Sequence, residues 1–198
     1  MNKRVILAGV LGGLAMFLWS SIAHMVLPLG RAGISEIPNE QTLLGSMHSA
    51  LGTSPGLYFF PGMGSDPDMQ HYEQKLAASP SGILIYHPPG GKALTPGQLA
   101  TEFLTELSEA LLLAWLIAQT RFESFIAKAS FSAVAGLLAV LPTNMSYWNW
   151  YGFPSSYTFV YMFVEFMGFI VAGLVASSLL RPMTVNSFVL QKNAGVST

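Results

Sequence analysis

The chain has 198 residues, of which 52% are hydrophobic and only 10% are charged, and its mean hydropathy is +0.48. Soluble domains carry about 25% charged residues, so this composition excludes an ordinary soluble domain and indicates a membrane protein. The net charge of −1 gives no basis for nucleic-acid binding, and the absence of cysteine excludes disulfides, thiolate catalysis and zinc–thiolate sites.

The first apolar segment, residues 5–29, is long enough to cross a membrane, which takes about 20 residues of helix. It follows two basic residues and contains one titratable side chain, His24. The alternative is a cleaved signal peptide, with Ser-Ile-Ala at residues 21–23 as a small-x-small cleavage site. The apolar run continues past that site, which favours an uncleaved helix.

A long connection, residues 30–98, follows this segment. Two apolar runs that end in proline and glycine, residues 56–60 and 82–87, are predicted to be strands. Two short helices are also predicted, one capped by Asn39 and running to Ser49 and one from Asp66 to Ala78. Without disulfides such a cap can bury little core of its own, so we expect it to lie on the membrane surface and on the outer helix ends.

Three further apolar segments are each long enough to cross a membrane: residues 99–120, 125–141 and 157–180. Thr95-Pro96 fits an N-cap and first-turn pair for the first of them, and Pro142 is predicted to end the second. The predicted fold is therefore an all-α membrane protein. It is a single membrane domain, a four-transmembrane-helix bundle with a small α+β extracytoplasmic loop between its first two helices and a cytoplasmic tail at residues 181–198.

The distribution of basic residues favours placing both termini in the cytoplasm. With the N-terminus inside, the inner side holds six of the nine basic residues: Lys3, Arg4, Arg121, Lys128, Arg181 and Lys192. The long loop holds the other three. The aromatic run at residues 147–151 then falls on the outer side between the third and fourth helices, where membrane proteins concentrate interfacial aromatic side chains.

Ionisable side chains inside apolar segments are the candidate site residues, because burying charge in a membrane is costly and usually has a function. Four of them are predicted to form one polar site, with Asn144 above it: His24, Glu106, Glu109 and Glu165. Glu102, one helical turn before Glu106, shares its face of the helix. A rise of about 1.5 Å per residue places the four roughly 8 to 15 Å below the outer boundary of the membrane.

This cluster has two interpretations. It is a carboxylate–imidazole site for a divalent metal or a proton relay, although the spacing lacks the Glu-x-x-His motif of di-iron bundles. Alternatively, the groups hydrogen-bond to one another, to Ser108, Asn144 and Tyr161, and to the cap, and only fix the packing. In the second case Glu102 lies in water.

Two rows of small residues predict close helix contacts. Gly9-x-x-x-Gly13 is a packing motif in the first apolar segment, and Gly168, Ala172 and Ala176 form a similar row in the last. The sequence leaves open whether these contacts are made within the chain or with a partner.

Four stretches of the chain resemble a family of small bacterial inner-membrane proteins with four predicted transmembrane helices and no assigned activity: FLWSSIAHMVLPLG (17–30), GLYFFPG (56–62), GILIYHP (82–88) and SYWNWYGFP (146–154). The likeness covers the chain from Arg4 to about Leu180. It implies a bacterial inner membrane and a periplasmic loop, but no activity, cofactor or catalytic residue.

These observations favour a non-enzymatic role as an accessory or scaffolding subunit of a larger membrane complex, such as a respiratory or photosynthetic one. The partners expected are membrane lipid and either another membrane protein or a second copy of the chain. One alternative is a small membrane enzyme or ion- or proton-handling protein that uses the His/Glu cluster. Another is a lipid or quinone binder with an apolar pocket between the helices and the cap.

Overall fold

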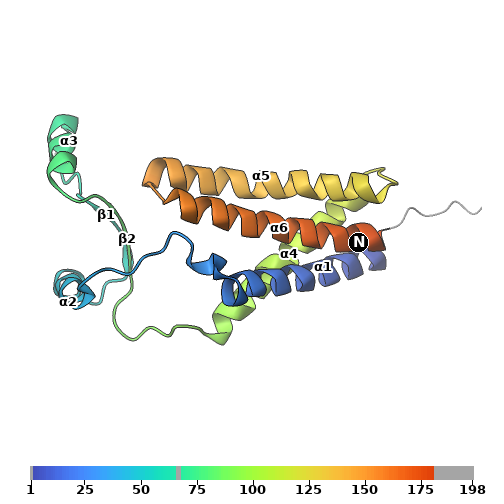
Figure 1. The fold of residues 1–198 in the computed structure, drawn as a ribbon, viewed down its shortest axis with the longest axis horizontal. Coiled ribbons are helices and arrows are strands. Elements are labelled where there is room, and N and C mark those ends of the chain that lie inside the picture. The colour runs from blue at the N-terminus through green and yellow to red at the C-terminus, as the bar shows by residue number, and fades with distance from the viewer. Residues whose placement is uncertain (1, 66–67, 181–198) are drawn as a thin grey trace, which may run out of the picture.

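The computed structural model describes residues 2–65 and 68–180. Four long helices form a bundle (Figure 1): α1 (Lys3–Ser21), α4 (Pro96–Gln119), α5 (Phe125–Tyr151) and α6 (Ser155–Leu179). The start of α1, the α4–α5 connection and the end of α6 lie at one end of this bundle, here called the N-terminal end. The opposite end, from which the connection between α1 and α4 projects, is called the loop end. The predicted tail at residues 181–198 lies outside the described residues.

Three helical segments of the described chain are long and apolar enough to cross a membrane: Lys3–Val26, Phe125–Tyr151 and Ser155–Leu179. Their outward faces carry large apolar side chains, such as Leu18, Leu138 and Phe159, which are 54%, 69% and 53% exposed. A surface of this kind is stable against lipid and costly in water. The chain therefore has the character of a membrane protein, with α4 as a fourth long helix that carries three glutamates.

The core of the bundle lies where α1 packs against α4 and α6, and α6 in turn packs against α5. Small side chains line these contacts, and the buried cluster consists of Val5, Ala8, Met16, Ala110, Leu113, Ala114, Ile117, Ala172 and Ala176. Because α1 supplies a third of this cluster, it is an integral part of the fold. This placement gives no support to the signal-peptide alternative for residues 5–29.

The two rows of small residues face other helices of the same chain. A side-chain carbon on Gly9 or Gly13 would lie 2.7 Å from the Cα of Leu111 or Leu107 in α4, so both glycines allow the two backbones to approach closely. On α6, Gly168 lies against Met16 of α1. The sequence left open whether these close helix contacts are made within the chain or with a partner. In the structure they are made within the chain.

The helix predicted to stop at Pro142 continues for nine further residues, to Tyr151. Proline removes one backbone donor, but a membrane helix tolerates this where neighbouring groups satisfy the freed carbonyls. The helix ends instead before Gly152, whose φ of 70° is accessible to glycine at little cost. The aromatic run at residues 147–151 is thus the last turn of α5 and not a connection between helices.

The first helix differs from the predicted segment, residues 5–29, at its end. After α1 the chain makes a π-helical turn, η1 (Ile22–Val26), and then leaves the helical conformation at Leu27. Leu27 precedes Pro28, and the residue before a proline disfavours helical geometry. A single 3₁₀ turn, η2 (Pro28–Arg31), follows.

The small sheet predicted in the loop is confirmed. Strands β1 (Gly56–Phe60) and β2 (Gly82–Tyr86) pair antiparallel, with Tyr58 opposite Leu84. The capping pair that was predicted for α4 is also present, because Thr95 and Gln98 form a reciprocal capping box.

Two short helices flank the hairpin, α2 (Glu40–Leu51) and α3 (Met69–Ala78). Asn39 precedes α2 with a φ of 55°, and its side chain makes no capping bond, contrary to the prediction. Asp68 caps α3 by accepting from the amide of Gln70 at 2.9 Å. The predicted start of this helix at Asp66-Pro67 lies outside the described residues.

The cap touches the bundle at few points. Neither α2 nor α3 contains a buried residue, and both project beyond the loop end (Figure 1). The Phe59 ring of the hairpin packs on Tyr151 at the end of α5, with 5.9 Å between ring centroids. Gly33, with a φ of 74°, lies against the backbone of Tyr157 at the start of α6. The cap is therefore fastened through β1 and through the segment that follows η2.

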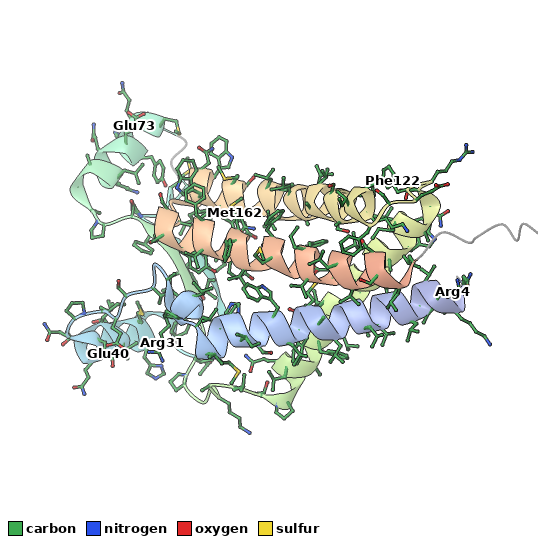
Figure 2. All side chains as sticks on the ribbon, turned by 45° about the vertical axis from the view of Figure 1, so that its right-hand side comes forward. Arg4, Arg31, Glu40, Glu73, Phe122 and Met162 are labelled. Atoms are coloured by element: carbon green, nitrogen blue, oxygen red, sulfur yellow. The ribbon has the colours of Figure 1, made fainter. Side chains whose placement is uncertain are left out.

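Lys128 joins two helices at the N-terminal end of the bundle. Its side chain is 4% exposed, and its ammonium group donates to the carbonyl of Leu180, directly after α6. A cation is favoured at this position because the last carbonyls of a helix lack intrahelical donors. The start of α5 and the end of α6 are joined in this way. Figure 2 shows Arg4, at the start of α1, at this same end of the bundle.

Candidate functional site

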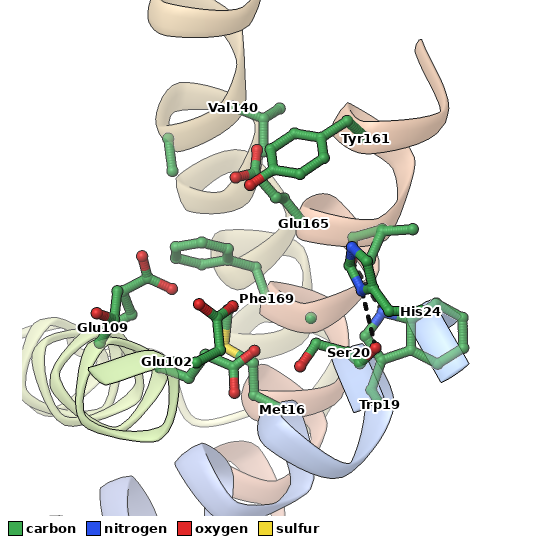
Figure 3. A pocket seen from close by; sticks show the side chains of 15 residues that line it. Met16, Trp19, Ser20, His24, Glu102, Glu109, Val140, Tyr161, Glu165 and Phe169 are labelled. Atoms are coloured by element: carbon green, nitrogen blue, oxygen red, sulfur yellow. Dashed lines mark hydrogen bonds between the residues drawn. The ribbon is translucent and has the colours of Figure 1, made fainter. Parts of the chain in front are cut away.

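A cavity of about 190 Å³ lies among the four bundle helices toward the loop end (Figure 3). It is called the glutamate pocket here, after the ionisable side chains that line it: His24, Glu102, Glu106, Glu109, Tyr161 and Glu165. Its walls are completed by side chains of α1, α5 and α6. The cavity is several times larger than the share of about 30 Å³ that one water molecule occupies in the liquid.

Three of the glutamates come from α4, where spacings of four and three residues place them on one helix face. Glu102 is exposed, Glu109 is half-buried, and Glu106 between them is only 5% exposed. Among the described residues, the Oε2 atom of Glu106 has no hydrogen-bond partner. A buried carboxyl oxygen without a donor is costly, so it marks a position where a ligand or water is needed.

Glu165 faces α4 from α6 (Figure 3). The side-chain amide of Asn144 donates to its Oε2 at 3.0 Å and to the carbonyl of Val140 at 2.8 Å. Asn144 is itself buried, so these two bonds fix the position of the Glu165 carboxyl group. The carboxyl group of Glu109 lies within electrostatic range of that of Glu165, across the pocket.

The α1 side of the pocket is built around the π-helical turn. His24 lies in this turn and donates from Nδ1 to the carbonyl of Ser20 at 2.9 Å, since a carbonyl can only accept. The hydroxyl of Ser20 donates to Phe17 at 3.2 Å and lies beside the Glu106 carboxyl group. Trp19 is held by a 2.9 Å bond from its indole N–H to the carbonyl of Val164.

A row of aromatic rings in contact, some stacked and some tilted, connects the cap with the pocket and is called the aromatic row here. Successive ring centroids lie 5.5 to 5.9 Å apart along Phe59, Tyr151, Tyr147, Phe153, Tyr157 and Tyr161. The last of these, Tyr161, lines the pocket beside Glu165 (Figure 3). Aromatic pairs at such distances stabilise one another and form a rigid wall.

The ionisable side chains that line the pocket are mostly acidic. Four carboxyl groups and one imidazole line it, and no lysine or arginine does so among the described residues. Within residues 2–65 and 68–180, however, no three His, Asp or Glu side chains come close enough together to hold a metal ion. The carboxyl groups therefore interact electrostatically across the pocket, but no three of these side chains lie close enough together to act as the ligands of one metal ion.

The structure brings together all four predicted site residues, His24, Glu106, Glu109 and Glu165, in this one pocket. Glu102, which one of the two interpretations placed in water, is exposed and also lines the pocket. Ser108 does not take part, because its hydroxyl donates to the carbonyl of Leu104 in its own helix at 2.7 Å.

Sequence reasoning missed Ser20 and Trp19. Ser20 lies four residues before His24, so the helical period already placed it on the same face. Trp19 gave no such signal, because an apolar segment contains many large side chains and their rotation about the helix is set only by packing.

No protein-family model, curated protein or solved structure matches this chain. The resemblance to small bacterial inner-membrane proteins therefore stays a prediction from the four stretches that carry it.

Proposed function

We propose that this chain is an integral membrane protein that binds a cation in the glutamate pocket, as part of an ion- or proton-handling role. The observation that carries the proposal is the Glu106 carboxyl group, which is 5% exposed and has one oxygen without a partner among the described residues. Three more carboxyl groups line the same pocket, and no lysine or arginine of the described residues does. A positive charge is the ligand that offsets both the desolvation and the mutual repulsion of these groups.

The proposal includes a membrane crossing by α4. Its 24 residues span about 36 Å at the usual helical rise, more than the roughly 30 Å of a hydrocarbon core. Glu106 and Glu109 face the pocket, whereas Leu112, Trp115 and Leu116 are exposed on the outside of the helix. An amphipathic helix with its acids turned inward is compatible with lipid, since intramembrane charges normally face the bundle interior.

The same proposal places the protein in a bacterial inner membrane with both termini in the cytoplasm. Lys3, Arg4 and Arg121 lie toward the N-terminal end of the bundle, which the positive-inside rule assigns to the cytoplasm. The loop end then faces the periplasm. The glutamate pocket lies in the outer leaflet and takes its ligand from that side.

The accessory-subunit hypothesis stays a prediction, but one of its supports is weaker. It rested in part on rows of small residues available for a partner, and Gly9, Gly13 and Gly168 are all in contact with helices of the same chain. A quinone binder is disfavoured by the four carboxyl groups, because such ligands are neutral and prefer mostly apolar pockets.

The test is a thermal-shift series on the protein in phosphatidylcholine nanodiscs, with chloride salts of Na⁺, K⁺, Mg²⁺, Ca²⁺ and n-butylammonium at equal ionic strength. A ligand at about ten times its Kd should raise the Tm by on the order of 5 °C. The pocket variant E106Q/E109Q/E165Q should lose this shift. The loop variant E36Q/E40Q/E73Q, which removes the same charge from exposed positions, should keep it. The proposal fails if every salt shifts wild type and pocket variant equally.

A further inference from the structure

We infer that the cation taken by the glutamate pocket is a primary ammonium group on a small organic molecule. This inference rests on the proposed cation site and names the chemical class of its ligand. Three properties of the pocket carry it: the Glu106 oxygen that has no partner and the lack of a metal-binding set, both within residues 2–65 and 68–180, and the mixture of carboxyl and aromatic walls.

The hydrogen-bonding capacity of the ligand follows from Glu106. Its Oε2 atom is buried and lacks a donor among the residues described, so the group that completes the site carries an N–H or O–H unless it is a metal ion. A primary ammonium offers three N–H donors, one of which satisfies the Glu106 oxygen, while its positive charge also attracts the carboxyl groups of Glu109 and Glu165 that line the same pocket. A quaternary ammonium offers none and leaves the Glu106 oxygen unsatisfied.

The size and spacing of the pocket disfavour a bare metal ion. A divalent metal needs several oxygen or nitrogen ligands at about 2.0–2.6 Å, and no three acidic or imidazole side chains of the described chain lie close enough together to supply them. The volume of about 190 Å³ is also far larger than a single ion requires. The space suits an ammonium group together with its carbon chain.

The remaining walls match the carbon part of such a ligand. Trp19, Tyr161 and Phe169 line the pocket together with the thioether of Met16. Aromatic faces attract ammonium groups and pack against alkyl carbons. The aromatic row, which ends at Tyr161, extends this type of surface from the pocket to the cap.

A primary ammonium reaches this pocket either as a free amine from the loop end or as the head group of phosphatidylethanolamine. The lipid would bring a phosphate next to its ammonium, and no lysine or arginine of the described chain lines the pocket to receive it. A free amine is therefore the favoured source.

The experiment is isothermal titration of the full chain in phosphatidylcholine nanodiscs with n-butylammonium, tetramethylammonium and Ca²⁺. Butylammonium should bind at one saturable site, at least tenfold more tightly than the other two. E106Q should weaken it about ten- to hundredfold, the range expected for losing a charge-assisted hydrogen bond. E73Q, an exposed glutamate of α3, should leave binding unchanged. If E106Q does not fold by circular dichroism, E109Q takes its place.

The outcomes separate the inference from the proposed function. If Ca²⁺ or tetramethylammonium binds as tightly as butylammonium and depends on Glu106, the cation site stands and the inference is overturned. If no cation binds, both fail. A repeat in phosphatidylethanolamine nanodiscs identifies the source: unchanged butylammonium affinity supports a free amine, and competitive weakening supports the lipid head group.

Discussion

Gly13 lies at a close approach of α1 to α4 that leaves no room for an added methyl group. A Cβ at this position would lie 2.7 Å from the Cα of Leu107, a backbone atom that cannot move aside without shifting α4. We therefore expect Gly13→Ala to destabilise the protein by about 1–3 kcal/mol, the usual cost of overpacking. The measurement is the thermal unfolding midpoint in nanodiscs.

The matched control is Gly45→Ala in α2. This glycine is also helical, but nothing lies within 4 Å of the position of its Cβ. Alanine there should be neutral or stabilise by up to about 1 kcal/mol, because it restricts the unfolded chain and favours the helix. Equal effects of the two substitutions would show that the α1–α4 contact is looser than the structure describes.

At the scale of residues, the ionisable side chains within apolar segments were the predictable part of the site. A carboxyl group is costly in lipid, so the pattern predicts that Glu106, Glu109 and Glu165 point inward, and the helical rise gives their relative depth, so their meeting could be anticipated. The partner of each individual carboxyl group could not be anticipated. Whether Glu165 pairs with Asn144 or with Glu109 depends on the rotation of α5 and α6, which a pattern of apolar residues leaves open.

At the scale of elements, the sequence predicted the long helices but not two of their ends. Pro142 is a strong stop signal in water, where a broken helix can hydrogen-bond to solvent, but lipid offers no such partner and the helix continues. The π-helical turn at Ile22–Val26 has no sequence signature at all. The hairpin was predictable because each strand ends at turn residues of known preference.

The junction of α5 with α6 depends on Lys128. Its ammonium group is buried and donates to the carbonyl of Leu180, so removing it leaves that carbonyl without this donor. We expect Lys128→Met, which keeps most of the side-chain volume, to destabilise the protein by about 1–3 kcal/mol. The thermal midpoint in nanodiscs measures this. Lys3→Met, an exposed lysine at the same end, should change the midpoint little. Similar midpoints for both variants would mean that water replaces the lysine.

At the scale of the whole molecule, the proposed crossing of the membrane by α4 has the largest consequences. Three segments of the described chain meet the length and composition of a membrane span, and α4 fails only through its glutamates. If α4 crosses, Glu106 lies about 15 Å along the helix from Pro96, in the low-dielectric interior where a carboxyl group strongly attracts a cation. If it does not, the pocket lies at the membrane surface and water weakens that attraction.

The chain contains no cysteine, so single cysteines report its topology directly. We expect Ser79→Cys, in the cap, to react with a membrane-impermeant maleimide in intact spheroplasts, and Glu123→Cys, in the α4–α5 connection, to react only after permeabilisation. Both positions are exposed, so a failure to react reflects the side of the membrane and not burial. Labelling of both from outside would mean that α4 does not cross. Labelling of Glu123→Cys alone would keep four crossings but reverse the orientation, and the glutamate pocket would then open to the cytoplasm.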